Sequence, residues 1–345
     1  MKVGMYYLNS DVRVEEMPVP EIGDDDILLK IMASGICGSD LMEFHRKKKA
    51  PFVPGHEVAG VIDQVGKNVK DYKPGDRIFV THHVPCDSCI ECRRGQGIYC
   101  NEFQKVNNFT PGGFAPYVRV TGRSLKTGAI KLPDEMTYEQ GSFIEPLGCV
   151  VEALKKLTGE AGFDGDSVLI EGAGVAGILN LQVARAYGAG RTIVTDINSY
   201  RLRIAKDLGA DVIMDARELN PETLRQVNEG RLADKIIIST GAKSATEQAF
   251  RCYGPGSDIM FFATPPENQN VSSDWYGAWR GVSRIGLTYG ATPKSNMTAF
   301  WLIKHGVVNV DRMITQKLPL EEIAQGFEIA SEAKDCLKVL IMPNN

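Results

Sequence analysis

The sequence lacks three features that would each point to a whole class of protein. It has no basic excess, since 39 lysines and arginines stand against 43 aspartates and glutamates. That balance argues against a general nucleic-acid-binding protein, which needs a strongly basic face. No uncharged apolar stretch approaches the ~18 residues of a membrane span, so none is expected. The first residues show no apolar run followed by a small-residue cleavage site, so we expect no secretory signal and a cytoplasmic protein.

The first 145 residues have the pattern of a β domain. With 345 residues in the chain, the usual domain size predicts about two domains. Short alternating apolar runs, separated by Gly, Pro and Asp, predict strands of a mainly antiparallel sheet. Examples of these runs are Ile27–Met32, Val58–Val65, Arg77–Val80 and Tyr117–Val120.

From about residue 150 the pattern changes to buried strands alternating with helical stretches, which predicts a doubly wound parallel sheet. The expected strands are Val168–Glu171, Arg191–Asp196, Asp211–Met214, Lys235–Ser239, Asp258–Phe262 and Arg284–Tyr289. Helical segments and a last strand, Lys338–Met342, follow. The predicted fold class is therefore α/β, with a β domain and a second domain built on a parallel sheet.

Half of the eight cysteines fall in one short window. Cys86, Cys89, Cys92 and Cys100 have the spacing C-x2-C-x2-C-x7-C. In a reducing compartment clustered cysteines are more often metal ligands than disulfides. Four thiolates from one short lobe can close the tetrahedral shell of structural zinc. The alternatives are an iron–sulfur cluster, whose known spacings do not include a final gap of seven, and chance or disulfide-bonded cysteines. We expect a zinc lobe at about residues 82–105.

A glycine motif indicates a dinucleotide site. Gly172, Gly174 and Gly177 form GxGxxG between a predicted strand and a predicted helix. In that context the first glycine permits a tight turn, the second lets a pyrophosphate approach the backbone and the third allows close helix packing. The alternative is a Gly-rich turn that binds no cofactor.

The second strand of this fold ends in an acid. Asp196 stands nineteen residues after Gly177, where a carboxylate binds the ribose hydroxyls and repels a 2′-phosphate. This favours NAD over NADP, although Arg201 could lie along the adenosine edge. We expect the cofactor to contact Gly172, Gly174, Val175, Ala176, Gly177, Asp196 and Arg201.

Three further motifs carry candidate catalytic groups. GICGSDLMEFH, PGHEVAG and FIEPLGCVV supply six side chains, namely Cys37, Ser39, Asp40, His56, Glu57 and Glu145. Alone, Cys37 is typical of a small buried hydrophobe and His56 of a packed or surface histidine. Glu145 lies in an apolar stretch and needs a partner if buried. Cys, His and Glu are all zinc ligands, and three of them with an open position make a catalytic site.

The motifs CGSD, GHE, the four-cysteine lobe, EPL and GAGVAG follow one another along the chain in this order. With them, the whole chain resembles the zinc-dependent medium-chain dehydrogenases, the superfamily of alcohol, sorbitol and threonine dehydrogenases. The acid in EPL is similar to the polyol dehydrogenase branch. The resemblance implies that Cys37, His56 and Glu145 bind a catalytic zinc, with Glu57 as a nearby or exchanging ligand. It also implies that Asp40 orients the His56 ring. Two zinc ions per chain would then be bound, one catalytic and one structural.

The same resemblance implies the domain boundaries and the reaction. A GroES-like catalytic domain would cover residues 1–147 and 289–345, with a Rossmann dinucleotide-binding domain at 148–288. Hydride would pass between an alcohol or ketone substrate and NAD, and Ser39 would receive the alcohol proton. A homodimer or homotetramer would be joined through strand edges near Trp275–Tyr289.

The chain departs from the family pattern near Ser39. Met42 stands where the family often has a histidine that ends the proton relay, and a thioether cannot carry a proton. The run Arg46, Lys47, Lys48 and Lys49 is typical of a solvated loop, or could hold an anionic group of the substrate.

Three functions stay open at this stage. The first is dehydrogenation of a polyol or sugar, including a phosphorylated or acidic derivative. The second is dehydrogenation of threonine or another amino alcohol. The third is a non-catalytic zinc- and nucleotide-binding scaffold, which a missing metal ligand would favour; none is missing. No nucleic-acid or membrane partner is expected.

Overall fold

The computed structural model describes residues 1–159, 161–267 and 269–344. They divide into two compact units. Unit 1 comprises Met1–Gly148, Ala291–Lys304 and Val310–Asn345, and unit 2 comprises Cys149–Gly290 and His305–Asn309. Within the described ranges, no helix is long and apolar enough to cross a bilayer.

Unit 1 is built on an eight-stranded, mostly antiparallel sheet. Its main path runs β15-β16-β3-β4-β5-β8, and β7, which also pairs with β6, pairs with β3. A separate two-stranded sheet joins β1 and β2. The strands are β1 (Lys2–Leu8), β2 (Asp11–Glu16), β3 (Ile27–Gly35), β4 (Glu57–Val65), β5 (Arg77–Val80), β6 (Phe109–Thr110), β7 (Tyr117–Val120), β8 (Ala129–Lys131), β15 (Ile314–Pro319) and β16 (Lys338–Met342).

Strand β3 is central to unit 1 because it pairs with β4, β7 and β16. Alternate residues Ile27, Leu29 and Ile31 are fully buried in one apolar core together with Val58 and Val118. Period-two alternation thus places one face of the strand against the core. At the far end of β3 the chain reaches Gly35 and leads directly into the site described below.

Short helices complete unit 1. They are α1 (Glu43–Arg46), α2 (Ile90–Arg93), α3 (Asn101–Lys105), α4 (Gly122–Gly128), α5 (Tyr138–Ser142), α12 (Pro293–Lys304) and α13 (Ile323–Glu332). Helix α6 (Ile144–Thr158) begins in unit 1 and continues into unit 2. A 3-10 helix, Gly38–Leu41, follows β3.

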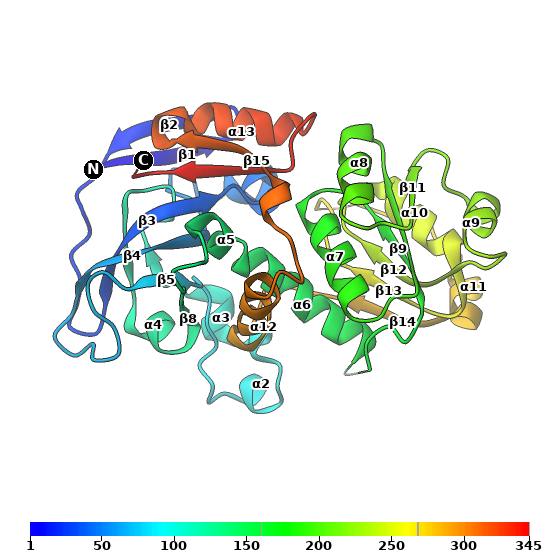
Figure 1. Ribbon diagram of the computed structural model, residues 1–345, viewed down its shortest axis with the longest axis horizontal. Coiled ribbons are helices and arrows are strands. Elements are labelled where there is room, and N and C mark those ends of the chain that lie inside the picture. The colour runs from blue at the N-terminus through cyan, green and yellow to red at the C-terminus, as the bar shows by residue number, and fades with distance from the viewer. Residues whose placement is uncertain (160, 268, 345) are drawn as a thin grey trace. The chain divides into compact units, whose positions relative to one another are not determined.

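Unit 2 is a six-stranded parallel sheet in the order β11-β10-β9-β12-β13-β14. The order reverses between β9 and β12, which is the point where open α/β sheets bind ligands. In Figure 1, α7 and α8 lie on one face of the sheet and α9, α10 and α11 on the other. The elements are β9 (Ser167–Glu171), α7 (Val175–Ala186), β10 (Arg191–Asp196), α8 (Ser199–Asp207), β11 (Val212–Asp215), α9 (Pro221–Val227), β12 (Ala233–Ile238), α10 (Lys243–Cys252), β13 (Tyr253–Phe261), α11 (Trp275–Gly281) and β14 (Val282–Leu287).

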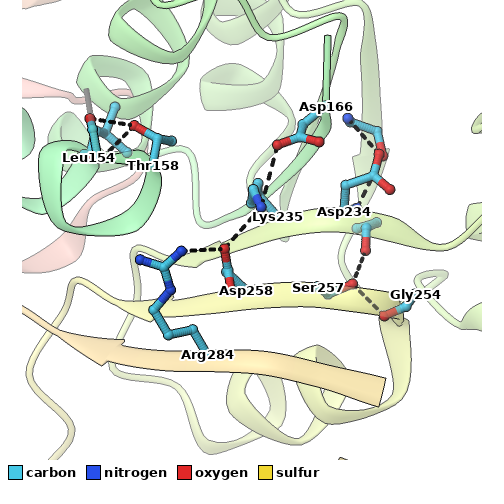
Figure 2. Close-up of polar contacts among 12 residues, drawn as sticks. Leu154, Thr158, Asp166, Asp234, Lys235, Gly254, Ser257, Asp258 and Arg284 are labelled. Atoms are coloured by element: carbon cyan, nitrogen blue, oxygen red, sulfur yellow. Dashed lines mark hydrogen bonds and ion pairs between the residues drawn. The ribbon is translucent and has the colours of Figure 1, made fainter. Parts of the chain in front are cut away.

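Charged side chains join β12, β13 and β14 (Figure 2). The carboxylate of Asp258, 2% exposed, accepts a hydrogen bond from Lys235 Nζ at 2.9 Å and lies 3.5 Å from an Arg284 nitrogen. Lys235 Nζ also lies 3.4 Å from Asp166. Burial alone would lower the pKa of Lys235, but Asp258 and Asp166 outweigh it and the pKa is raised. The network keeps a buried carboxylate paired and holds the edge strand β14 in the sheet.

Candidate functional site

The four clustered cysteines form one compact thiol set. Their Sγ atoms all lie within 4.8 Å of one another. The backbone N–H groups of Cys86 and Cys89 donate to the Sγ atoms of Cys100 and Cys86, at 3.4 and 3.3 Å. Since zinc–sulfur bonds are about 2.3 Å long, sulfurs at these separations fit a tetrahedral zinc ion.

A second donor set lies at the end of β3. Cys37 follows this strand and caps the 3-10 helix, where its Sγ accepts the Ser39 backbone N–H at 3.4 Å. His56 and Glu57 stand where β4 begins. Ligand atoms of Cys37, His56 and Glu57 lie within 4.8 Å of one another. The structure thus brings together three predicted ligands from two chain segments, and a thiol, an imidazole and a carboxylate fit catalytic zinc.

The turn before His56 depends on glycine. Gly55 has φ +98°, a conformation that L side chains rarely adopt. A Cβ there would also lie 2.8 Å from the backbone nitrogen of Phe114. The motif PGHE therefore needs its glycine to deliver His56 to the start of β4.

Asp40 is placed to orient the His56 ring. It is 1% exposed, and its Oδ1 lies 3.5 Å from His56 Nδ1. Burial would raise the pKa of Asp40, but His56, Arg46 and the Cys37 N–H outweigh it and the pKa is lowered. The carboxylate therefore stays charged. It can fix the ring so that the other nitrogen faces a metal.

Glu57 has a buried partner that the sequence did not suggest. Lys338 donates to the Glu57 carboxylate and, at 3.1 Å, to the Ile36 carbonyl. Burial would lower the pKa of Lys338, but Glu57 and Cys37 outweigh it and the pKa is raised. A Cβ on Gly35 would collide with both side chains of the pair. One signal for this partner was available: a lysine opens the otherwise apolar strand KVLIM.

Glu145 lies in the same unit but outside this three-residue set. It is the second residue of α6, 8% exposed, beside the fully buried Ile144 and Leu147. The expected burial of this acid is therefore present. Its role as third zinc ligand stays a prediction.

Within the basic run, only Arg46 departs from the expectation of a solvated loop. Arg46 Nη2 donates to Ser39 Oγ at 2.9 Å, whereas Lys47, Lys48 and Lys49 are exposed. His82, which sequence reasoning did not single out, has its ring 5.0 Å from that of His56. Burial lowers the pKa of His82, so its ring is neutral. The THH segment carries no motif that would have marked it.

The glycine motif forms the expected cradle in unit 2. Gly172 has φ +101°, and a Cβ on Gly177 would collide with the Gly172 carbonyl oxygen. Gly174 caps the N-terminus of α7, whose first residues, Val175 and Ala176, have N–H groups without intrahelical acceptors. A helix N-terminus of this kind suits a pyrophosphate. The three glycines therefore fit a dinucleotide.

Asp196 and Arg201 flank that cradle. Asp196 accepts the backbone N–H groups of Ala173 at 2.7 Å and Asn198 at 2.8 Å. The Arg201 Nη1 atom lies 3.7 Å from where a Cβ on Gly174 would stand. The carboxylate is thus fixed at the end of β10, and a guanidinium lies over the phosphate-binding turn.

Comparisons with known proteins relate both parts of the chain to dehydrogenase domains. The chain matches the alcohol dehydrogenase GroES-like domain over residues 23–134 and the zinc-binding dehydrogenase domain over residues 174–300. It is 30% identical to sorbitol dehydrogenase of Bacillus subtilis (100% of this chain, 98% of that one) and 29% identical to L-threonine 3-dehydrogenase of Bacillus velezensis (96% and 95%). The crystal structure of galactitol-1-phosphate dehydrogenase from Escherichia coli is similar at TM-score 0.86 and 30% identity, over 99% of this chain and 100% of that one.

Proposed function

We propose a specific reaction for this chain, which belongs to the zinc-dependent medium-chain dehydrogenases. In this reaction a hydride is transferred between a secondary alcohol of a polyol or sugar and NAD. The observation that carries the proposal is the set of Cys37, His56 and Glu57, whose ligand atoms lie within 4.8 Å of one another. The same chain also carries a glycine cradle with an acid at the end of β10. Together these features provide a zinc site and a hydride acceptor site.

We propose that Cys37, His56 and Glu145 hold the catalytic zinc, with Glu57 beside them. The four-cysteine set would hold a second, structural zinc. Bound zinc supplies Lewis acidity that favours loss of the alcohol proton, and bound NAD supplies the hydride acceptor.

The chain's own polar groups then do the remaining work. Asp40 holds the His56 ring, 3.5 Å away. Ser39 accepts the alcohol proton and donates its own to the next acceptor, which is the cofactor ribose or water. Met42 cannot serve as that acceptor, because its thioether does not take up a proton.

For the cofactor we propose NAD, with NADP as the less favoured alternative. The Asp196 carboxylate is fixed by two backbone N–H groups. It would accept hydrogen bonds from ribose hydroxyls and repel a 2′-phosphate. Arg201, which lies over the phosphate-binding turn, would instead attract a 2′-phosphate and favour NADP.

For the substrate we propose a polyol or sugar, since the chain is 30% identical to a sorbitol dehydrogenase. The second candidate is threonine or another amino alcohol, favoured by the 29% identity to L-threonine 3-dehydrogenase. The exposed lysines 47–49 and the similarity to galactitol-1-phosphate dehydrogenase support testing phosphorylated polyols as well.

We further propose that the chain acts as a homodimer or homotetramer in the cytoplasm. Strand β14 ends one edge of the unit 2 sheet. Large exposed side chains gather on β14 and on α11, where Trp275, Tyr276, Trp279 and Leu287 are each at least 64% exposed. An apolar edge of this kind suits a second copy. The four-thiol set needs reduced cysteines, as the cytoplasm provides.

A substrate screen and one variant pair test the proposal. Polyols, sugars, sugar phosphates and amino alcohols are offered with NAD, and NADH absorbance and zinc content are measured. We expect turnover of a polyol or sugar and zinc in both donor sets. Glu145→Ala should abolish turnover and spare the fold, whereas Glu135→Ala, at an exposed acid of unit 1, should leave activity unchanged. Full activity of Glu145→Ala with both zincs bound would overturn the ligand assignment.

A further inference from the structure

The Arg46 side chain turns back from α1 onto the 3-10 helix that carries Ser39. The chain turns at Met42, which separates the two helices. Arg46 Nε donates to the Ser39 carbonyl at 2.8 Å, and Nη2 donates to Ser39 Oγ at 2.9 Å. The Arg46 guanidinium thus hydrogen-bonds both the backbone and the side chain of Ser39.

The same guanidinium also reaches the carboxylate that orients the His56 ring. Arg46 Nη2 lies 3.3 Å from Asp40 Oδ1, and that oxygen lies 3.5 Å from His56 Nδ1. The Arg46 side chain is 17% exposed and that of Asp40 is fully buried. Arg46 therefore links the serine hydroxyl, the buried carboxylate and the candidate zinc-binding histidine in one chain of contacts.

The chemistry of this contact fixes the direction of the serine proton. Arginine is always charged and only donates, so Ser39 Oγ must accept from it. A hydroxyl has one proton and two lone pairs, and one lone pair is now taken. The hydroxyl proton must point away from Arg46, and one lone pair stays available for a proton from the substrate.

We propose that Arg46 is a positioning residue for Ser39: it holds the hydroxyl so that one lone pair faces the alcohol and the O–H faces the next acceptor. The inference rests on the proposed function. In the step, the alcohol O–H bond breaks and Ser39 gains that proton while it passes its own to water or ribose. Hydride leaves the same alcohol carbon for NAD, so one alcohol and NAD⁺ give one ketone, NADH and one proton.

The proposal separates Arg46 from the three lysines that follow it. Lys47, Lys48 and Lys49 are exposed, whereas the Arg46 side chain is only 17% exposed. A purely structural Arg46 would only fasten α1 to the 3-10 helix. Replacing it would then lower stability without a specific effect on the proton step.

Kinetics of the zinc-loaded enzyme with NAD and a neutral polyol test the proposal. Arg46→Met should lower kcat about tenfold or more, a barrier increase of about 1.4 kcal/mol, with little change in KM. Added guanidinium ion at low millimolar concentration should restore part of kcat, and methylammonium at equal ionic strength should not. The matched control Lys126→Met, at an exposed lysine of α4, should keep full kcat. Zinc content and the thermal unfolding temperature are measured for every variant.

A double-mutant cycle with Ser39→Ala separates positioning from structure. If Arg46 acts through Ser39, adding Arg46→Met to Ser39→Ala lowers kcat no further. Independent, multiplying effects, or a full kcat in Arg46→Met, would overturn the proposal. If Arg46→Met fails to fold or loses zinc, Arg46→Lys replaces it in the same cycle, because it keeps the charge and loses the two-point grip. If the wild type oxidises no alcohol at all, the proposed function fails instead, so the two failures are distinguishable.

Discussion

Lys338 and Glu57 form a buried ion pair between two strands that lie 281 residues apart in the sequence. Both side chains are 1% exposed. A buried charge without a partner is strongly destabilising, and in this pair each side chain compensates the charge of the other. Because Glu57 neighbours Cys37 and His56, the pair also fixes the charge beside the candidate zinc site.

Replacing Lys338 with methionine should therefore destabilise the protein strongly. The substitution leaves the Glu57 carboxylate buried and unpaired, a loss on the order of 3 kcal/mol. The free energy of unfolding from denaturant titration measures it. Adding Glu57→Gln should recover part of the loss, because the neutral amide needs no counter-ion. A Lys338→Met protein as stable as the wild type would contradict the buried pair.

The buried carboxyl of Glu171 predicts that the stability of the protein depends on pH. This acid ends β9, is 1% exposed, and neither carboxylate oxygen has a hydrogen-bond partner among the described residues. Burial raises the pKa of Glu171 well above its usual range, and Arg251 offsets this only in part. In the unfolded chain a glutamate carboxyl ionises near pH 4.3. The contribution of Glu171 to the free energy of unfolding should therefore be most favourable below that pH. It should fall as the pH rises toward the pKa that Glu171 has in the folded protein.

The variant Glu171→Leu should remove this dependence. Above neutral pH it should be more stable than the wild type by about 1–3 kcal/mol, the cost of an unsatisfied buried polar group. Unfolding free energies of both proteins between pH 4 and 8 provide the measurement. A difference that does not grow with pH would show that the pKa of Glu171 is not raised in the folded state, so that the carboxyl ionises there as it does in the unfolded chain.

The four-cysteine lobe gives a prediction about metal removal. Cys89→Ser opens the thiol set, and structural zinc contributes folding energy directly. We expect a lower unfolding temperature and the loss of one zinc, while Cys149→Ser, outside the lobe, keeps both. Chelation of the wild type should mimic Cys89→Ser. A fully stable Cys89→Ser protein that lacks this zinc would argue against a structural role.

The sequence predicted the strands of the parallel sheet well, because buried parallel strands are nearly continuous apolar runs. β10 has the expected bounds, and β9 begins one residue early. The combination of a GroES-like domain and a parallel-sheet Rossmann domain is confirmed. Strand β15 was missed. Strand β15, ITQKLP, is half exposed and ends in proline, so only its pairing with β16 identifies it.

The site shows the same division between local and distant information. Cys37 and His56 could be named as candidate ligands because their motifs are local. Lys338 was missed because its partner is 281 residues away. The contact of Arg46 with Ser39 depends on the turn at Met42. No periodicity or spacing encodes that turn.

The last prediction concerns cofactor choice. In NADP a phosphate replaces one of the ribose hydroxyls that Asp196 would bind. The carboxylate then loses a hydrogen bond and faces a like charge, which costs several kcal/mol where water is scarce. Since the Ala173 and Asn198 N–H groups hold the carboxylate, it cannot turn away without breaking those bonds. The wild type should prefer NAD at least tenfold in kcat/KM, a difference of about 1.4 kcal/mol.

Asp196→Ser should narrow or reverse this preference, because Arg201 remains over the phosphate-binding turn to meet the phosphate. Arg201→Ala should act the other way and weaken NADP further, so the two variants form a matched pair. The double variant should show little discrimination, since it lacks both charges. Steady-state kinetics with both cofactors on all four proteins measure these differences. A wild type that uses NADP as well as NAD would mean that Arg201, and not Asp196, dominates the adenosine site.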